Sequence, residues 1–348
     1  MTNVNRLPEF EYATPLQDHG FLSFDADNPG ARALLREAIY EVAPSERMPL
    51  SIHYEDEHQL LRLLSLLQSR IQPEQSERIQ CLIIADRESD TGWTPLRSLF
   101  GDVGGHSVAD TILNRLFTSH MQPIVSANGA PVGYEFLLRP LPELPPFKPA
   151  ALFEAARRTG QHAFLDRAAR ESAIRVGASH LRNGTKRFVN FLPSSLHDPD
   201  SCLRCTFDAI RETGTEPADY VFEVIETERL DDPGIARVFD VARANGVRLA
   251  LDDVGTGFAT LDTVDRLRPD YVKMDRQWVS GCDADESKQR YIEDLINRSA
   301  RFGGTVLAEG VERAEEWDYL RRAGVPLLQG FLFGRAAPVP VGTKAGAH

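Results

Sequence analysis

The sequence predicts an α/β protein in which a small α/β module precedes a (β/α)8 TIM-like barrel. Short apolar runs that end in a polar or ionisable residue recur after residue 121. Helical patterns fill most of the intervals between these runs, and alternating strands and helices indicate a parallel sheet. Roughly 225 residues follow a Gly/Asp-rich stretch at 101–110, close to the roughly 250 residues of such a barrel.

The predicted first module covers residues 1–115 and has the order βαβαβ. Its strands are expected at 20–24, 49–54 and 80–85, with helical patterns from Ala31 and from Glu55 between them. In the second pattern one helical face is apolar, formed by Leu60, Leu64, Leu67 and Ile71. A further helical pattern at 109–120 predicts a connecting helix. We expect a regulatory or sensory module whose type the sequence does not define.

The predicted barrel covers residues 116–342, and residues 343–348 are expected to form a disordered tail. Five of its strands are expected at 187–190, 219–226, 247–253, 270–275 and 304–310. Their polar or ionisable residues are Asn190, Glu223, Asp252 with Asp253, Lys273 and Glu309, which lie 21 to 36 residues apart, the length of a strand, a helix and two loops. A doubly wound open sheet is the structural alternative, but it normally needs a glycine-rich phosphate loop that the sequence lacks.

Composition and charge exclude several classes of function. The net charge of -12 argues against broad electrostatic binding to nucleic acid polymers or to anionic membranes. The sequence has neither an apolar run long enough for a membrane span nor the pattern of a secretory signal at its start, so we expect a cytoplasmic location. Four cysteines are too few for a disulfide scaffold, and Cys202 and Cys205 are expected to be unpaired thiols.

The acidic strand ends indicate a divalent-metal site. At one barrel mouth the carboxylates would repel each other strongly unless cations lay between them. Oxygen ligands without clustered His or Cys suit Mg²⁺ or Mn²⁺, and Lys273 would add a positive charge. Phosphoryl chemistry and enolase-like chemistry both use such sites, and composition does not decide between them. The carboxylates are Glu135, Glu223, Asp252, Asp253 and Glu309.

Residues from about Met121 to Pro340 resemble the EAL-domain family of cyclic di-GMP phosphodiesterases. Eight segments match the family in order and spacing. They are MQPIV (121–125), YEFLLR (134–139), FVNFLP (188–193), FEVIE (222–226), LALDDVGTGFATL (249–261), DYVKMDRQWV (270–279), VLAEGVE (306–312) and LLQGFLFGR (327–335).

The resemblance implies a role for each matching residue. Ligands of a first metal would be Glu135, Asn190, Glu223 and Asp252. Asp253 would face a second metal, with Asp252 bridging. Lys273 and Glu309, together with Glu135, would form the catalytic set around the attacking water. Substrate contacts would come from Gln122, Arg139 and Gln329. Supporting roles would fall to Glu226 and Glu312, although a shifted register gives the role of Glu226 to Glu228.

The expected activity is metal-dependent hydrolysis of cyclic di-GMP to linear pGpG, with two Mg²⁺ or Mn²⁺ ions per active site. A catalytically inactive cyclic di-GMP receptor is the alternative, and a barrel lyase of the enolase type is a more distant one. The resemblance also implies a homodimer. The chain departs from the family pattern at Phe136, Leu192, Ile225 and Val254, none of which removes a metal ligand. Phe136 follows Glu135 on a strand and should point to the opposite face.

Overall fold

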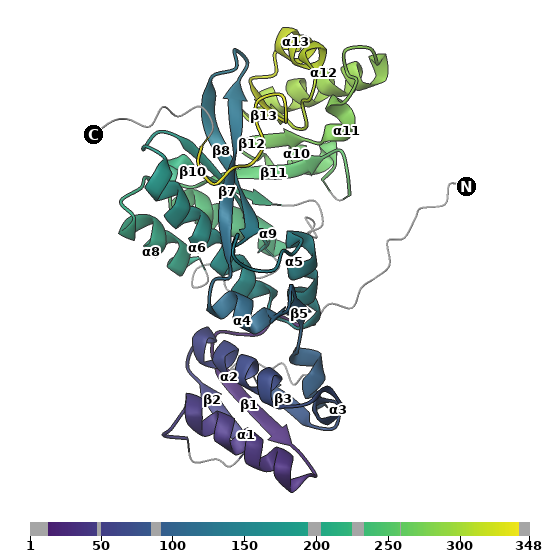
Figure 1. The fold of residues 1–348 in the computed structure, drawn as a ribbon. Helices are drawn as coiled ribbons and strands as arrows, with labels where there is room; N and C mark the ends of the chain where they lie inside the picture. The colour runs from purple at the N-terminus through teal and green to yellow at the C-terminus, as the bar shows by residue number, and fades with distance from the viewer. Residues whose placement is uncertain are drawn as a thin grey trace. The chain divides into compact units, whose positions relative to one another are not determined.

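The computed structural model describes residues 13–46, 50–84, 92–193, 203–224, 233–257 and 259–340 (Figure 1). The chain divides into two compact units. The first comprises Met1–Phe117 with Arg139–Ala168, and the second comprises Thr118–Leu138 with Ala169–His348. Residues 139–168, which the sequence assigns to the barrel, fall in the first unit, so the predicted boundary after residue 115 stays a prediction.

The first unit contains a four-stranded sheet in the order β2-β1-β3-β4, and its neighbouring strands run antiparallel. The strands are β1 (Gly20–Asp25), β2 (Ser51–Tyr54), β3 (Gln80–Ile84) and β4 (Thr94–Pro95). The helices are α1 (Pro29–Val42), α2 (Glu57–Arg70), α3 (Pro73–Ser76), the 3₁₀ helix η1 (Leu96–Leu99), α4 (Val108–Leu113) and α5 (Pro149–Arg158). A separate hairpin pairs β5 (Asp102–Val103) with β6 (His106–Ser107).

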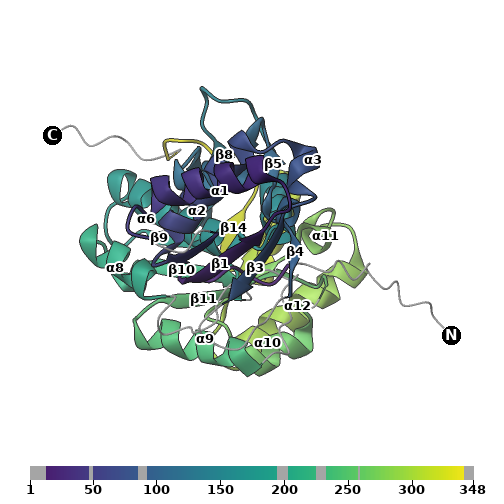
Figure 2. The same cartoon turned by 90° about the horizontal axis from the view of Figure 1, so that it is seen from below.

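Local sequence explains where the helices of this unit begin. The side chains of Asn28 and Asp56 accept backbone N–H groups at the starts of α1 and α2, as N-cap residues do. The predicted apolar face of α2 is buried, and α1 and α2 pack side by side (Figure 2). The predicted βαβαβ order is present, with the short α3 added before β3.

The helix expected at 109–120 is wrong in its second half. Helix α4 ends at Leu113, because the Asn114 side chain donates to Asp110 (2.7 Å) and Arg115 adopts a left-handed φ of 50°. From Phe117 the chain is extended, and Phe117, Ser119 and Met121 alternate as buried residues.

The second unit is built on a closed eight-stranded barrel in the order β10-β11-β12-β13-β14-β7-β8-β9. The strands are β7 (Phe117–Ser126), β8 (Pro131–Pro140), β9 (Lys186–Phe191), β10 (Tyr220–Val224), β11 (Arg248–Val254), β12 (Tyr271–Met274), β13 (Thr305–Ala308) and β14 (Leu327–Gln329). Successive strands from β8 to β14 pair in parallel, as predicted. Strand β7 instead runs antiparallel to β14, so the barrel is not wholly parallel.

Helices between the strands surround the barrel (Figure 1). They are α6 (His162–His180), α8 (Arg204–Glu212), η3 (Pro217–Asp219), α9 (Pro233–Ala244), α10 (Leu261–Leu267), α11 (Arg276–Val279), α12 (Glu286–Ala300) and α13 (Ala314–Ala323). A large apolar core lies between strands and helices. Phe136 belongs to it, and a Cβ added at Gly177 of α6 would lie 2.9 Å from its ring. The side chain therefore points away from Glu135, as expected.

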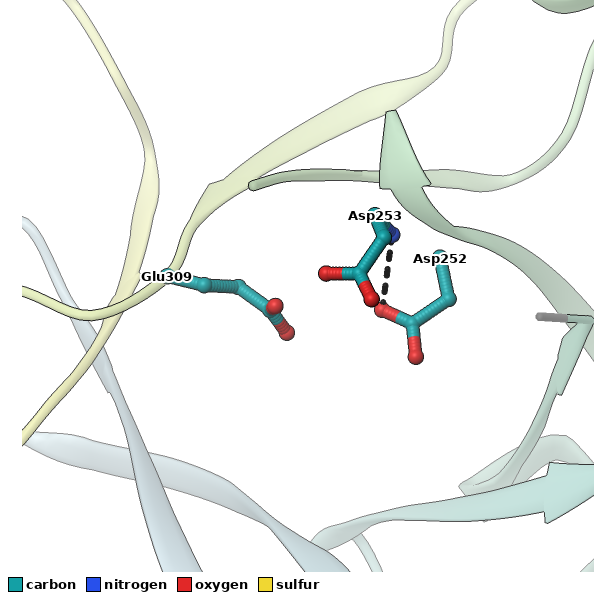
Figure 3. Close-up of side chains that lie close together, drawn as sticks. All are labelled: Asp252, Asp253 and Glu309. Atoms are coloured by element: carbon teal, nitrogen blue, oxygen red, sulfur yellow. Dashed lines mark hydrogen bonds between the residues drawn. The ribbon is translucent and has the colours of Figure 1, made fainter. Parts of the chain in front are cut away.

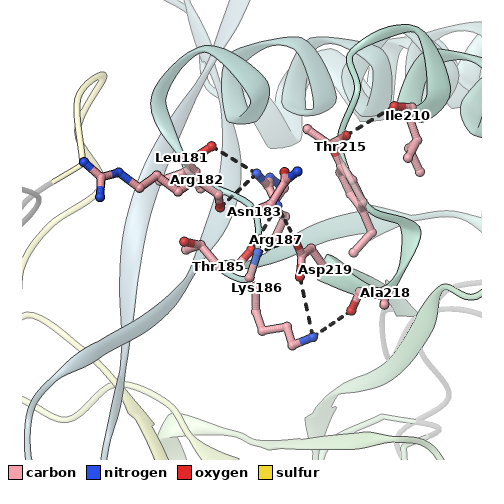
Figure 4. A network of polar contacts seen from close by, with 12 residues as sticks. Leu181, Arg182, Asn183, Thr185, Lys186, Arg187, Ile210, Thr215, Ala218 and Asp219 are labelled. Carbon is pink, nitrogen blue, oxygen red and sulfur yellow. Dashed lines mark hydrogen bonds and ion pairs between the residues drawn. The ribbon is translucent and has the colours of Figure 1, made fainter. Parts of the chain in front are cut away.

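A buried ion pair fixes the amino ends of β9 and β10 (Figure 4). Arg187 is fully buried and donates to Asp219 (3.1 Å) and to the carbonyl oxygens of Thr185 and Leu181. Asp219 also accepts the backbone N–H of Gly184 (2.7 Å). Because this end of a barrel lies opposite the carboxyl ends of the strands, the network serves stability.

Candidate active site

Side chains along each barrel strand point alternately inward and outward. This alternation places the candidate side chains next to one interior apolar layer, on the side of the carboxyl ends of the strands. That layer consists of Ile124, Phe188, Val221, Ala250 and Leu307. Residues two apart on a strand point to the same face. Four members of the layer are each followed, two residues later, by a candidate site residue. These residues are Asn190, Glu223, Asp252 and Glu309. Gln122 lies two residues before Ile124, and because β7 runs in the opposite direction, it faces the same mouth.

Lys273 on β12 lies at the centre of this mouth. Its Nζ is 2.7 Å from Glu309 Oε1 and 2.8 Å from both Glu223 Oε1 and Asp252 Oδ1. Glu135 Oε1 is 3.8 Å away. The side chain of Lys273 is only 1% exposed and that of Glu223 is fully buried, so these charges interact with little screening by water.

Burial and neighbouring charges shift the protonation of the cluster. Burial raises the pKa of Glu223 and of Glu309 well above the usual range, and the Lys273 ammonium opposes this shift only in part. For Lys273, burial alone would lower the pKa. The surrounding carboxylates, with Asp252 and Glu135 strongest, outweigh burial and raise the pKa. Without cations, burial and the neighbouring carboxylates therefore favour the protonated forms of Glu223 and Glu309, while Lys273 favours the charged forms.

A β-bulge brings two consecutive acids to the same mouth. Leu251 pairs with Val272 and Val254 with Met274, so β11 has one residue more than β12 in this interval. A bulge of this kind redirects a side chain that strict alternation would place outside. Asp253 has a left-handed φ of 47°, and its backbone N–H donates to Asp252 Oδ1 at 3.0 Å.

Three carboxylates point toward one space (Figure 3). One oxygen each from Asp252, Asp253 and Glu309 lies within 4.8 Å of the other two, close enough to hold a single cation. Carboxylate oxygens are the ligands preferred by Mg²⁺ and Mn²⁺.

A second observation supports a cation in the mouth. Both carboxylate oxygens of Glu223 are buried and lack a hydrogen bond within the described part of the chain, as does the amide oxygen of Gln329. Glu223 has only the ionic contact with Lys273 at 2.8 Å. Buried carboxylate oxygens are normally hydrogen-bonded or bound to a metal, so these residues fit a cation.

Of the predicted substrate residues, Gln329 contacts a member of this cluster. Gln329 at the end of β14 donates from Nε2 to Glu135 Oε2 at 2.6 Å. Gln122 on β7 donates to the carbonyl oxygen of Gly334 (3.4 Å). Arg139 follows Glu135 by four residues on β8, so both side chains leave the strand on the same face.

The predicted supporting residues have different outcomes. Glu312 pairs with Arg276 at 3.1 Å and does not contact Lys273 in the described structure. Glu226, its alternative Glu228 and the departure Ile225 lie outside the described residues. Cys202 also does, whereas Cys205 is exposed.

Sequence reasoning missed Glu316, which holds the segment after Glu309. This buried carboxylate accepts the backbone N–H groups of Gly281, Glu312 and Arg313 at 2.9 to 3.1 Å. Glu316 lies three residues after Arg313, the N-cap residue of α13, which is where a capping box has its Glu or Gln. This spacing was the available sequence signal.

The family comparison agrees with this geometry. A family model for the EAL domain matches residues 106–336. The chain belongs to the EAL domain family. It is 30% identical over 224 residues to the probable cyclic di-GMP phosphodiesterase PdeG of Escherichia coli, covering 61% of this chain and 43% of that protein. It is 33% identical over 233 residues to an uncharacterized protein of Azorhizobium caulinodans, covering 63% and 31% respectively. The chain thus spans less than half the length of either relative.

Solved structures of EAL proteins resemble the barrel. A standalone versatile EAL protein from Vibrio cholerae in its c-di-GMP-bound form has a TM-score of 0.58 and 28% identity, covering 64% of this chain and 92% of that chain. The manganese and cyclic di-GMP complex of Klebsiella pneumoniae BlrP1 has a TM-score of 0.59 and 29% identity, covering 64% and 56%. In the described part of this chain, no helix is both long and apolar enough to cross a membrane.

Proposed function

We propose that this protein is a metal-dependent phosphodiesterase that hydrolyses cyclic di-GMP to linear pGpG. The observation that carries the proposal is the arrangement of Lys273 among Glu135, Glu223, Asp252 and Glu309, beside the open group of Asp252, Asp253 and Glu309. Relatives named as cyclic di-GMP phosphodiesterases and EAL structures with cyclic di-GMP bound support the substrate.

Charge balance supports two divalent cations per site. Five carboxylates and one ammonium leave four negative charges at the mouth, which two divalent cations would neutralise. Glu135, Asn190, Glu223 and Asp252 would hold the first Mg²⁺ or Mn²⁺ ion, and Asp253 with Asp252 the second. Bound cations would supply the positive charge that lowers the pKa of a water and offsets the phosphate charge.

Lys273 and Glu309 then position and deprotonate the attacking water. Their charged atoms are 2.7 Å apart, so one water near both can donate to Glu309 Oε1 while Lys273 Nζ holds its oxygen. Attack in line with the departing 3′ oxygen opens one phosphodiester. Gln122, Arg139 and Gln329 orient the nucleotide, with the Arg139 guanidinium on a phosphate.

Three further features complete the proposal. Residues 1–115 form a regulatory or sensory module, and residues 116–342 form the catalytic barrel as a homodimer. The low cysteine content favours a reducing compartment, and we place the activity in the cytoplasm.

The test is incubation of the purified full chain with cyclic di-GMP and Mg²⁺ or Mn²⁺, followed by chromatography of the nucleotides. We expect pGpG to form, and to be absent when a chelator is added. Asp318→Asn, on the exposed face of α13, is the control substitution and should leave turnover unchanged. Tight binding of cyclic di-GMP, measured by calorimetry in Ca²⁺, together with no pGpG in Mg²⁺ or Mn²⁺ would contradict the phosphodiesterase proposal. That result would favour the receptor.

A further inference from the structure

The short helix α11 follows the Lys273 strand and contacts the turns on both sides of it. On one side lies the turn after Asp253, where Gln277 Nε2 donates to the carbonyl oxygen of Gly255 at 3.0 Å. On the other side lies the turn after Glu309, where Arg276 of α11 packs against Gly310. The backbone N–H of Glu309 itself donates to the carbonyl oxygen of Met274, the last residue of β12, at 3.1 Å. Asp253 and Glu309 each contribute an oxygen to the three-carboxylate group.

Trp278 of α11 packs directly against Gly255. Its indole stacks on Tyr291 of α12, with ring centroids 3.7 Å apart and planes 10° apart. A Cβ added at Gly255 would overlap Trp278 Nε1 and lie 2.7 Å from Tyr291 Oη. Gly255 also has a φ of 103°, so only glycine suits both the backbone and the space. The aromatic pair therefore sets how far this turn can move toward α11.

Hydrogen bonds stabilise the turn that follows Asp253 and contains Gly255. The backbone N–H and the hydroxyl of Thr256 donate to the carbonyl oxygen of Asp253 at 3.1 and 2.8 Å. The N–H of Gly255 donates to the carbonyl oxygen of Ala259 at 2.8 Å. A non-glycine residue with a left-handed φ, such as Asp253, persists only where its surroundings hold it in place.

The opposite turn rests on Arg276 in a similar way. A Cβ added at Gly310, which follows Glu309, would lie 2.5 Å from Cγ and 2.7 Å from Cβ of Arg276. The Arg276 guanidinium pairs with Glu312 at 3.1 Å, but this pair is exposed and contributes little by itself. The packing against Trp278 is therefore the stronger constraint on the spacing of the two turns.

We propose that Trp278 is a positioning residue that sets the place of Asp253 and thereby the affinity of the Asp252, Asp253 and Glu309 group for a divalent cation. This inference rests on the proposed function, since it concerns the same site. Residues that orient metal ligands typically change metal affinity by about 10- to 100-fold when they are replaced.

The first test measures Mn²⁺ binding to the full chain without nucleotide, by electron paramagnetic resonance of the free ion. Trp278→Ala should weaken the binding of Mn²⁺ by about 10-fold or more. Trp278→Phe, which keeps an aromatic ring against Tyr291, should restore most of the affinity. Trp317→Ala is the matched control, because Trp317 is also half-buried but packs against Phe333 and Ala127 instead. Equal affinity losses in the two alanine variants would overturn the proposal.

The second test follows hydrogen exchange of the Gly255, Thr256 and Ala259 amides in metal-free protein. These amides all donate within the turn, so Trp278→Ala should speed their exchange and Trp317→Ala should not. If Trp278→Ala changed neither the exchange of these amides nor the Mn²⁺ affinity, the positioning role of Trp278 would be overturned. The proposed phosphodiesterase function would not be affected by that result. If the unsubstituted protein bound no Mn²⁺, the metal-dependent function and the role of Trp278 in affinity would both fall, whatever the exchange showed.

Discussion

Lys273 Nζ and Glu309 Oε1 lie 2.7 Å apart, although the two residues come from adjacent strands and their side chains are both largely buried. A lone ammonium at this depth would lose its proton readily. Four carboxylates keep Lys273 charged, and Lys273 in turn is the cationic contact of Glu223 within the described residues. Lys273 therefore stabilises the carboxylate cluster when no cation is bound.

Asp253→Asn should abolish most phosphodiesterase activity while leaving the fold intact. The variant keeps the size of the side chain but removes a charge from the three-carboxylate group. Because partners of metal ligands alone change activity by about 10- to 100-fold, loss of a ligand should cost about 100-fold or more. Chromatography of pGpG measures the rate, and circular dichroism checks the fold. Activity near that of the parent protein would refute the role of Asp253.

Lys273→Met should destabilise the metal-free protein and make it more dependent on cations. Removing one partner of a buried ionic cluster costs about 3–5 kcal/mol, because the remaining charges lose their compensation. Thermal unfolding with a chelator should therefore show a lower melting temperature, and Mn²⁺ should raise it by more than in the parent. Lys288, whose ammonium donates to the carbonyl oxygen of Ser280 away from the cluster, provides the control Lys288→Met. Identical melting temperatures of the two variants, with chelator and with Mn²⁺, would contradict the stabilising role of Lys273 among the buried carboxylates.

Asp219→Asn should destabilise the barrel without impairing catalysis. The change leaves the fully buried Arg187 without its carboxylate, at a cost of about 3–5 kcal/mol (Figure 4). Because both residues lie at the amino ends of the strands, the activity per folded molecule should be unchanged. Asp208→Asn removes an exposed pair with Arg211 and should change stability by less than about 1 kcal/mol. A lower kcat in Asp219→Asn at full folding would show that the two ends are coupled.

Glu316→Gln should lower stability at neutral pH and have little effect in acid. Burial alone would raise the pKa of Glu316, but the N–H groups of Gly281, Glu312 and Arg313 lower it overall. A lowered carboxyl pKa contributes stability above the unfolded value near 4.5, and this contribution is lost as the pH falls through the folded pKa. Melting temperatures of parent and variant should therefore differ at pH 7 and converge once the pH falls below the lowered folded pKa of Glu316. The exposed neighbour variant Glu315→Gln should show no such pH dependence.

Much of the barrel could be predicted because its strands carry a simple pattern. Phe188, Val221, Ala250 and Leu307 are apolar, and a polar or acidic residue follows each of them after one intervening position. That period of two gives the direction of each side chain without any knowledge of the tertiary structure. The grouping of Glu135, Glu223, Asp252 and Glu309 around Lys273 follows from it.

Other features depend on tertiary contacts that no local pattern contains. Alternation places Asp253 outside the barrel, and only the bulge opposite Lys273 brings it to the mouth. The direction of β7 is set by its pairing with β14, far along the chain. Trp278 and Gly255 meet because α11 packs against a turn from another strand, so neither residue alone predicts the contact.

The antiparallel pairing of β7 with β14 also determines when the barrel can close during synthesis. Ser126 pairs with Leu327, and Met121 pairs with Ala337, so each link joins segments separated by about two hundred residues. A ribosome must release the chain as far as Ala337 before both links form, and pairings so distant in sequence slow folding. Before Glu309 and Gln329 are released, the mouth lacks both side chains, so the group of acidic residues around Lys273 is incomplete in the nascent chain.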